Sequence, residues 1–295
     1  APVRVAPSAG SLMSNTQLPR AQQSSWLGYG FLVYFLLCLS LSIGLMRWQD
    51  TKPPRFSDSP VPQAPAMQAR ETPDFRAIAN VQHKKAQFFE FIAEGARQQN
   101  VYLARLRQWL VNQQQRQQAG LSVDETTIAT LATRYRASQG NRTETLNQLL
   151  LHVDEIPLSL VLAQAANESA WGTSRFALEA NNFFGQWCFS TGCGVVPKQR
   201  PQGASYEVRR FASADQSIAA YFDNINSHPG YSSLRQLRKQ LREQQKALDG
   251  VQLAQGLTHY SSRGAAYVEE LQAMIRYNRL EKYDSATVAA PESLN

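Results

Sequence analysis

The chain has 295 residues, of which 43% are hydrophobic and 18% charged, and a formal net charge of +7 at pH 7. This composition excludes a wholly disordered chain, because it supplies enough apolar surface to bury the core of one or two domains. The excess of positive charge favours an anionic partner, such as nucleic acid, anionic lipid or an acidic cell-wall polymer, without choosing among them.

An uncharged apolar stretch, residues 26–46, follows an N-terminal tail of residues 1–25. Its length is close to the roughly 20 residues that cross a hydrocarbon core at a rise of about 1.5 Å each. Trp26 and Trp48 stand at its two ends, where aromatic rings prefer the membrane interface. We therefore predict a transmembrane helix. The alternative is a cleaved signal peptide, whose apolar region is shorter and ends in small residues.

The next segment, residues 47–73, is predicted to be a proline-rich linker. Six prolines between residues 51 and 73 disfavour a helix or a central strand and favour an extended chain. We expect a spacer without a binding partner, which holds a folded domain some distance from the bilayer.

Residues 74–142 have the apolar spacing of helices and are predicted to form a supporting helical region. Apolar residues recur three and four positions apart at Phe88, Phe91, Ile92, Leu103, Leu106 and Leu110. The intervening stretch EGARQQN fits either a continuous helix or a break. A shorter helix is predicted over SVDETTIATLATRYRA, with Ser122 or Asp124 as its N-cap. No heptad repeat persists far enough for a coiled coil.

A second domain is predicted over residues 143–283, built around a central helix that starts at Ile156-Pro157. The run IPLSLVLAQAAN leaves this helix little polar face, which predicts burial on most sides. Glu168 follows the run directly. A carboxyl buried there keeps its proton through a raised pKa, as catalytic acids do. The alternative places Glu168 at the helix end, facing solvent.

Aromatic residues surround this acid in the sequence, at Trp171, Phe176, Phe183, Phe184 and Trp187. An aromatic wall, with the small Gly172 one turn from the acid, suits the close approach of a sugar ring.

Two motifs give the sequence a family resemblance. The pattern E-S-x-W-G-x-S at residues 168–174, followed by N-x-F-G at residues 182–185, resembles the glucosaminidase domain of bacterial cell-wall hydrolases, including the flagellar rod-associated enzyme. The stretch WGTS, a following pair of cysteines and HPGYSS at residues 228–233 are similar to the Bax-like proteins of that group. The resemblance covers roughly residues 143–280. It implies a mainly α, lysozyme-like helical domain with a small β-hairpin, which cleaves peptidoglycan on the reducing side of N-acetylglucosamine.

Glu168 is the predicted general acid, since glycoside hydrolysis needs a protonated carboxyl beside the glycosidic oxygen. The resemblance implies a second catalytic glutamate on a hairpin after the N-x-F-G loop, and Glu207 in GASYEVRRF is the candidate. Alternatively, Glu207 faces solvent on its strand and the 2-acetamido oxygen of the substrate takes its place. Tyr260 and Tyr267 loosely match a tyrosine segment of the family that would orient the acetamido group. Tyr267 equally fits a core contact on a helical stripe.

The remaining site predictions concern substrate binding and cysteine chemistry. Substrate-binding roles are expected for Trp171, Asn182, Phe184, Gly185 and Trp187. Cys188 and Cys193, in the glycine-containing stretch WCFSTGCG, are predicted to form a small-loop disulfide, as an oxidising compartment allows. A zinc pair is the alternative, but no second Cys or His pair is spaced to complete four ligands. We expect no metal and no cofactor.

A basic amphipathic helix is predicted over SSLRQLRKQLREQQKAL. Its leucines, Leu234, Leu237 and Leu241, are expected to face the core. Its cations, Arg235, Arg238, Lys239 and Arg242, are expected to face solvent, with contact to an anionic wall polymer as a secondary possibility. A C-terminal tail, residues 284–295, ends the chain.

Together these features predict a single-pass protein of the bacterial inner membrane, with its catalytic domain in the periplasm, where peptidoglycan lies. The expected activity is that of an endo-β-N-acetylglucosaminidase with the peptidoglycan glycan strand as partner. A non-catalytic peptidoglycan-binding module and a lytic transglycosylase are the alternatives. Nucleic acid is not an expected partner, because no recognised motif accompanies the charge.

Overall fold

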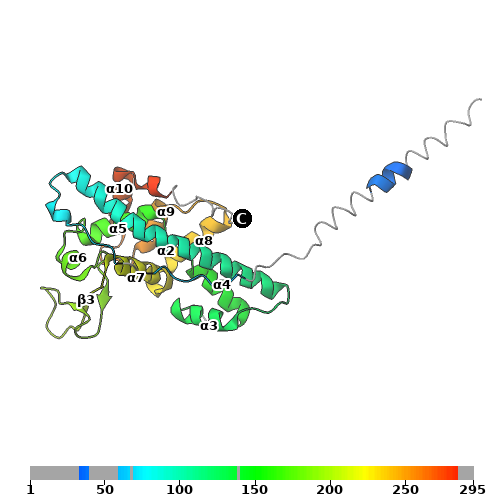
Figure 1. Ribbon diagram of the computed structural model, residues 1–295, viewed down its shortest axis with the longest axis horizontal. Coiled ribbons are helices and arrows are strands. Elements are labelled where there is room, and N and C mark those ends of the chain that lie inside the picture. Colours follow the sequence, from blue (N-terminus) through cyan, green and yellow to red (C-terminus); the bar gives the residue numbers. More distant parts are fainter. Residues whose placement is uncertain (1–32, 40–58, 67–68, 138–139, 285–295) are drawn as a thin grey trace, which may run out of the picture. The chain divides into compact units, whose positions relative to one another are not determined.

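The computed structural model describes residues 33–39, 59–66, 69–137 and 140–284 (Figure 1). The chain divides into two compact units, Ala1–Arg55 and Phe56–Asn295. In the first unit residues 33–39 are helical and exposed, and the rest of the predicted span 26–46 lies outside the described residues. Among the residues that are described, no helix is both long enough and apolar enough to cross a membrane.

The second unit is mainly α-helical, as predicted, and carries one small sheet. Its elements are η1 (Phe75–Ala77), α2 (Val81–Gln118), α3 (Glu125–Arg134), α4 (Arg142–His152), α5 (Leu158–Ser169), α6 (Arg175–Ala180), β1 (Trp187–Cys188), β2 (Gly194–Val195), β3 (Glu207–Arg209), α7 (Ala214–Ser227), η2 (Pro229–Tyr231), α8 (Ser232–Glu243), α9 (Gly250–Leu253), η3 (Ala254–Leu257), α10 (Ala265–Asn278) and η4 (Leu280–Tyr283). The three strands are antiparallel, with β3 in the middle.

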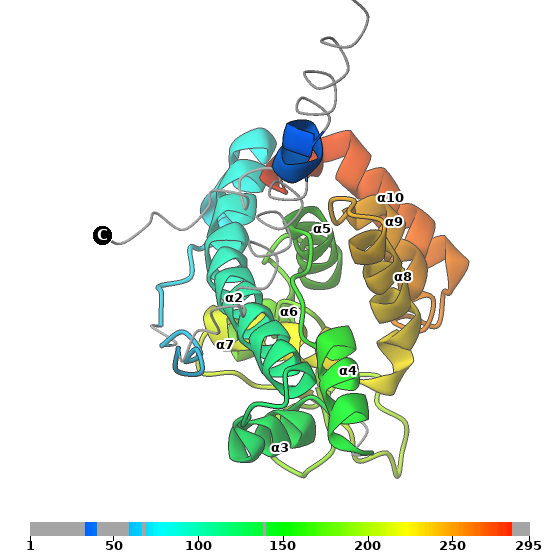
Figure 2. The same cartoon turned by 90° about the vertical axis from the view of Figure 1, so that its right-hand side faces the viewer.

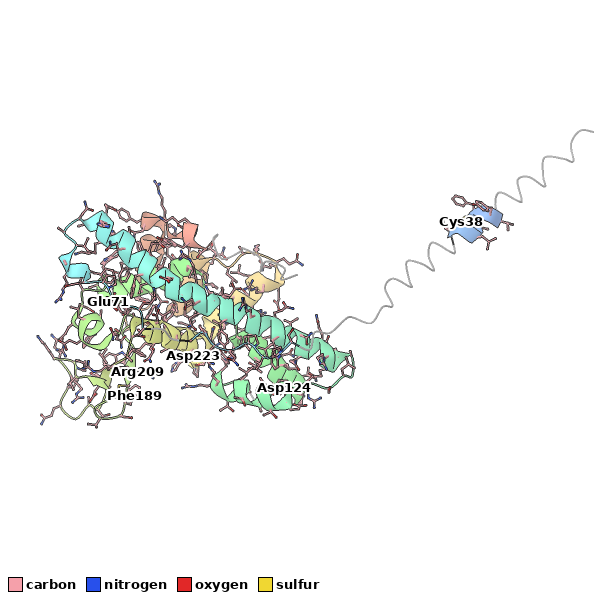
Figure 3. All side chains as sticks on the ribbon, in the orientation of Figure 1. Cys38, Glu71, Asp124, Phe189, Arg209 and Asp223 are labelled. Atoms are coloured by element: carbon pink, nitrogen blue, oxygen red, sulfur yellow. A yellow bond between two sulfur atoms is a disulfide. The ribbon has the colours of Figure 1, made fainter. Side chains whose placement is uncertain are left out.

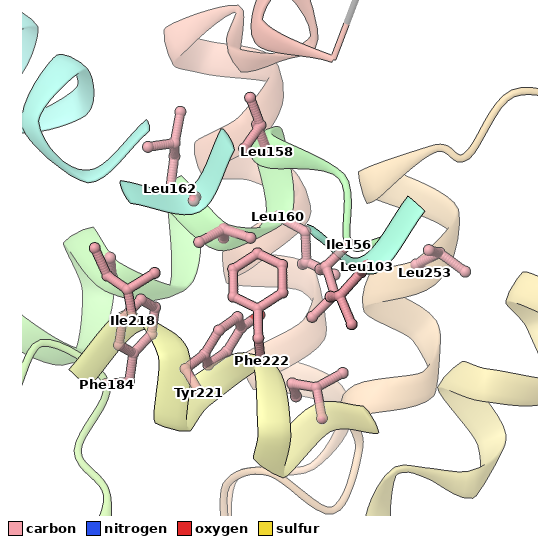
Figure 4. Close-up of a cluster of buried hydrophobic side chains, with 14 of the residues drawn as sticks. Leu103, Ile156, Leu158, Leu160, Leu162, Phe184, Ile218, Tyr221, Phe222 and Leu253 are labelled. Atoms are coloured by element: carbon pink, nitrogen blue, oxygen red, sulfur yellow. The ribbon is translucent and has the colours of Figure 1, made fainter. Parts of the chain in front are cut away.

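Helix α5 lies in the middle of this unit, with α2 on one side and α8, α9 and α10 on the other (Figure 2). Every residue from Leu158 to Ala166 is buried, as the apolar run predicts. Figure 4 shows leucines of α5 packed among side chains from α2, α7 and α9. Pro157 is the N-cap rather than the first helical residue. Because a proline cannot cap with its side chain, Asp284 does so, accepting from the backbone N–H of Ser159 at 2.8 Å and its hydroxyl at 2.6 Å.

Helix α2 is continuous over 38 residues, which settles the open question of a break at EGARQQN. Its buried face supplies a wall of the core, with Phe88, Ile92 and Leu106 fully enclosed. Gly95 lies where α7 approaches most closely, because a Cβ there would come within 2.6 Å of Asp215. The supporting region and the second predicted domain therefore share one core.

The described part of the linker has no regular secondary structure, as its prolines predict, but it packs on the domain. The Arg70 side chain donates from Nε to both carboxylate oxygens of Asp215, at 3.1 and 3.0 Å. It also donates to the carbonyl of Phe91 at 2.9 Å. This part of the linker therefore has a partner, which is the domain itself.

Helix α8 corrects the prediction that its arginines face outward. Leu234 and Leu241 point into the core as expected, but Arg235 and Arg238 are also buried. Arg238 donates to the carbonyl of His152 at 2.9 Å and to the side chain of Asn226 at 2.7 Å. A helix end leaves carbonyls without partners, and a guanidinium carries enough donors to satisfy several of them at the end of α4.

Asp154 completes this buried cluster. Burial alone would raise its pKa, but the charges of Arg238, Arg107 and Arg242, with a hydrogen bond from Arg242, hold the pKa below the usual value. Arg242 donates to Asp154 at 2.8 Å. Because the pKa of Asp154 is lower in the folded chain than in the unfolded chain, its ionised form stabilises the fold at a pH above the ordinary carboxyl pKa. This contribution is lost as the pH falls through the lowered pKa of the folded chain.

We expect Arg238→Ala to lower the free energy of unfolding by about 3 kcal/mol or more, because it removes a buried positive charge beside Asp154 and leaves several carbonyls without their donor. The matched control is Lys239→Ala, on the same helix but exposed, for which a change below about 0.5 kcal/mol is expected. Urea denaturation of both variants measures the difference. Equal stabilities would contradict the assigned role of Arg238.

Candidate active site

Glu168 lies in the last turn of α5, where the buried helix emerges from the core, and it is half-buried. The helix stops abruptly because Ala170, Trp171 and Gly172 all adopt positive φ angles, of 49°, 60° and 75°. For the two residues with side chains, this conformation costs about 1 kcal/mol each. Strain of this kind persists only where surrounding contacts impose it.

Packing holds this turn in place. The Trp171 ring lies edge-on against Phe88 and Phe89, with centroids 5.9 and 5.2 Å away. The Phe75 ring fills the space beside Gly172, so a Cβ there would lie 2.4 Å from it. Trp171 is partly buried and therefore anchors the turn by packing against the aromatic core, and only glycine fits at position 172.

A directional chain of buried hydrogen bonds ends on the Glu168 carboxyl. The Tyr221 hydroxyl donates to Gln164 Oε1 at 2.6 Å, and Gln164 Nε2 donates to the Tyr267 hydroxyl at 3.1 Å. Tyr267 is in turn hydrogen-bonded to Glu168. Because a hydroxyl has a single proton and Tyr267 accepts from Gln164, it gives its proton to Glu168. The chain thus fixes the carboxyl from one side.

Burial raises the pKa of Glu168, even though hydrogen bonds from Tyr267 and Asn167 act in the opposite direction. A carboxyl in such surroundings keeps its proton at a higher pH than an exposed one. Burial and the charge of Glu168 also raise the pKa of Tyr267, so the phenol stays protonated and remains a donor.

The loop of residues 181–186 forms the other side of the site. Asn182 is buried and holds the loop in shape, donating to the carbonyls of Gln186 and Arg209 at 2.9 Å each. The Tyr260 hydroxyl donates to the carbonyl of Phe184 at 2.7 Å. Gly185, with φ 62°, passes so close to Glu168 that a Cβ would lie 3.2 Å from its Oε2. The backbone therefore approaches the acid where a larger residue would crowd it.

A groove of about 640 Å³ adjoins the loop of residues 181–186, whose Gly185 lies next to the acid. One face of α7 forms its floor, and its walls come from the loop at Gln186–Phe189, strand β3 and the segment 228–231. Figure 3 labels Phe189, Arg209 and Asp223, which line it. Glu168 itself is not among the lining residues, but Gln186 directly follows Gly185, and Tyr231 has its pKa raised by burial and by the Glu168 charge.

The Glu207 carboxylate has a different environment. It is covered, and its two oxygens accept from the backbone N–H groups of Gly192 at 3.0 Å and Gly194 at 2.8 Å. These two hydrogen bonds lower its pKa. Glu207 therefore braces the loop between β1 and β2, and the solvent-facing alternative considered for it is wrong.

The predicted disulfide is confirmed, since Cys188 and Cys193 are bonded with their Cα atoms 6.2 Å apart. In the described part of the chain, these cysteines and Glu207 are the one group of three potential ligands close enough to share a metal ion. Because both sulfur atoms are tied up in the disulfide, this group does not act as a zinc site.

The structure gathers some of the predicted site residues and separates others. Glu168, Gly185, Tyr260 and Tyr267 lie together, and Trp187 lines the groove. The remaining predicted binding residues, Trp171, Asn182 and Phe184, support the site from behind, and the Phe184 ring is stacked at 4.2 Å on a buried tyrosine of α7.

Sequence reasoning missed Gln164, Tyr221 and Tyr231. Gln164 carried a usable signal, because a fully buried amide within an apolar helix must find hydrogen-bond partners. Tyr231 stands in the HPGYSS stretch, but that stretch did not indicate a place near the acid, and Tyr221 had no signal. Their positions relative to Glu168 arise only from the packing of α7 and η2.

Comparisons with known proteins place the chain in a family. Residues 144–280 match the glucosaminidase family, described as mannosyl-glycoprotein endo-beta-N-acetylglucosaminidase. The chain is 32% identical to protein bax of Escherichia coli strain K12 over 209 residues, which is 70% of this chain and 74% of that protein. No solved structure matches. The chain therefore belongs to the Bax-like proteins with a glucosaminidase domain.

Proposed function

We propose that this protein is a membrane-anchored peptidoglycan hydrolase, an endo-β-N-acetylglucosaminidase in which Glu168 is the general acid. The observation that carries the proposal is a half-buried carboxyl with a raised pKa at the end of a buried helix, next to the loop that borders a groove with an aromatic wall. Family membership supports the same class of reaction.

In the proposed reaction, the glycan strand lies in the groove with its glycosidic oxygen next to Glu168. The carboxyl gives its proton to that oxygen while the C1–O bond breaks, which neutralises the leaving group and leaves an oxocarbenium-like sugar. The hydrogen bond from Tyr267 stabilises the carboxylate that results. Gly185 leaves room for the sugar ring at this point.

The opposite face of the sugar needs a second group. Both Glu207 oxygens accept backbone hydrogen bonds, which favours the 2-acetamido oxygen of the substrate as the nucleophile that bonds to C1. A water then attacks C1, the bond from C1 to the acetamido oxygen breaks, and the Glu168 carboxylate takes a proton from the water. Glu207 keeps the loop of the groove wall in position in this scheme. In the alternative scheme, which the family resemblance implies, Glu207 is the second catalytic carboxylate.

Glu168→Gln is expected to lower turnover of purified sacculi by at least about 10²-fold, because it removes the transferable proton but preserves the size of the side chain. The matched control is Glu269→Gln on α10, which is exposed and is expected to keep full activity. Release of reducing ends measures both. Digestion by Glu168→Gln at the unsubstituted rate would refute the mechanism.

Glu207→Gln separates the two schemes for the second group. A structural role predicts a loss of activity below about tenfold, with a lower melting temperature, because a glutamine amide cannot accept both backbone hydrogen bonds. Assays of turnover and thermal unfolding, run together, test this. A loss as large as that of Glu168→Gln at unchanged melting temperature would instead make Glu207 the second catalytic carboxylate.

A lytic transglycosylase is the second candidate. It is favoured because both Glu207 oxygens accept backbone hydrogen bonds, so that Glu168 is the one proposed carboxyl left to act on the substrate. Mass spectrometry of the digested sacculi distinguishes the two. A reducing N-acetylglucosamine end identifies the glucosaminidase, and a 1,6-anhydro end identifies the transglycosylase. Binding without any cut identifies a non-catalytic module.

We also propose that residues 26–46 anchor the protein in the inner membrane, with the catalytic domain in the periplasm. The uncharged apolar span and the disulfide, which needs an oxidising compartment, support this arrangement. Protease added to spheroplasts should therefore digest the C-terminal domain. Its complete protection in intact spheroplasts, with digestion only after lysis, would contradict the arrangement.

A further inference from the structure

We propose that the groove also binds the acidic peptides of peptidoglycan through Arg209 and Arg136, so that the protein prefers peptide-bearing glycan to bare glycan. The inference rests on the proposed function, since it specifies what the same site recognises beyond the sugars. It follows from four features of the groove: the position of the Arg209 guanidinium, the position of the Arg136 guanidinium, the charges around them and the exposed aromatic rings.

Arg209 is held in place on the groove wall. Its backbone N–H donates to the carbonyl of Gln186 at 2.9 Å, and its own carbonyl accepts from Asn182 at 2.9 Å. Its guanidinium lies over the Phe211 ring, 4.9 Å from the centroid. An aromatic support limits the movement of the side chain, so less rotamer freedom is lost when an anion binds.

Arg136 reaches the same groove from a different part of the chain. It follows the C-terminus of α3, and its φ of 52° turns the backbone sharply after that helix. It lines the groove together with Arg209. Among the described residues, no carboxylate forms an ion pair with either guanidinium.

The acidic residues nearby already have partners. Asp223 lines the groove, but Arg134 donates to both of its oxygens, at 3.0 and 3.2 Å. Glu207, two residues before Arg209, is occupied by backbone N–H groups and is not part of the groove lining. The groove therefore presents two uncompensated cations, and a guanidinium binds a carboxylate through two parallel hydrogen bonds.

The same groove presents apolar ring faces to solvent. Trp187 is 50% exposed and Phe189 is 75% exposed, and both rings line the groove, so it offers apolar faces to a ligand. Aromatic faces suit sugars, and guanidinium groups suit carboxylates. Peptidoglycan is a polymer that combines both, because its muramic acid residues carry short peptides with free carboxyl groups.

The test is a calorimetric titration of the full chain in detergent, in the Glu168→Gln background so that the ligand is not consumed. The probes are glycan fragments of one length in three forms: with peptides, without peptides, and with peptides whose carboxyl groups are amidated. We expect the first form to bind about tenfold more tightly than the other two, which corresponds to about 1.4 kcal/mol.

Arg209→Gln and Arg136→Gln, added to the same background, should each reduce this preference severalfold. The matched control is Arg210→Gln, because Arg210 is the next residue in sequence, contacts the carbonyl of Glu179 and does not line the groove. It should keep the preference.

Equal affinity for the three forms would overturn the inference, as would a preference that survives amidation. The proposed hydrolase activity is tested separately, by measuring whether the unsubstituted chain digests sacculi. A chain that cuts nothing but still binds peptide-bearing glycan through Arg209 would refute the hydrolase and support the groove assignment.

Discussion

The requirement that α5 be enclosed on every side governs the rest of the structure. A helix without a polar face is stable only when other elements cover it, and here α2, α9, α10 and η4 do so. Its N-terminus is capped by Asp284 and its C-terminus by three residues of positive φ, so both ends are fixed as well. Glu168, one residue from that C-terminus, is therefore held by the core rather than by a flexible loop.

Burial also explains why polar side chains near the acid form a continuous chain of hydrogen bonds. An unpaired amide in the core costs about 1–3 kcal/mol, so Gln164 needs a partner for its oxygen and another for its nitrogen. Tyr221 and Tyr267 provide them, and the proton order that results leaves Tyr267 with its donor directed at Glu168. A structural demand of the core thus orients the Glu168 carboxyl.

Features that depend on local sequence were predictable, and those that depend on distant partners were not. The apolar run of α5, the capping of α3 by Asp124 and the disulfide follow from residues close together in the chain, and all three are confirmed. The burial of Arg238 was not predictable, because helical spacing alone assigns an arginine to the solvent face and the carbonyls it satisfies lie more than 80 residues away. Distant partners also decide the site. The motif pointed to Glu168 as the candidate acid, but it did not show which aromatic rings would be buried and which would line the groove.

The boundaries of the family match are not the boundaries of the folding unit. The match covers residues 144–280, whereas the wall of α2 against α5, the Phe75 ring beside Gly172 and the cap from Asp284 all lie outside it. A fragment cut at those limits would expose the apolar side of α5 and release the turn that carries the acid. Helix α2 therefore cannot be exchanged like a separate module, because it forms one half of the core and the matched region forms the other.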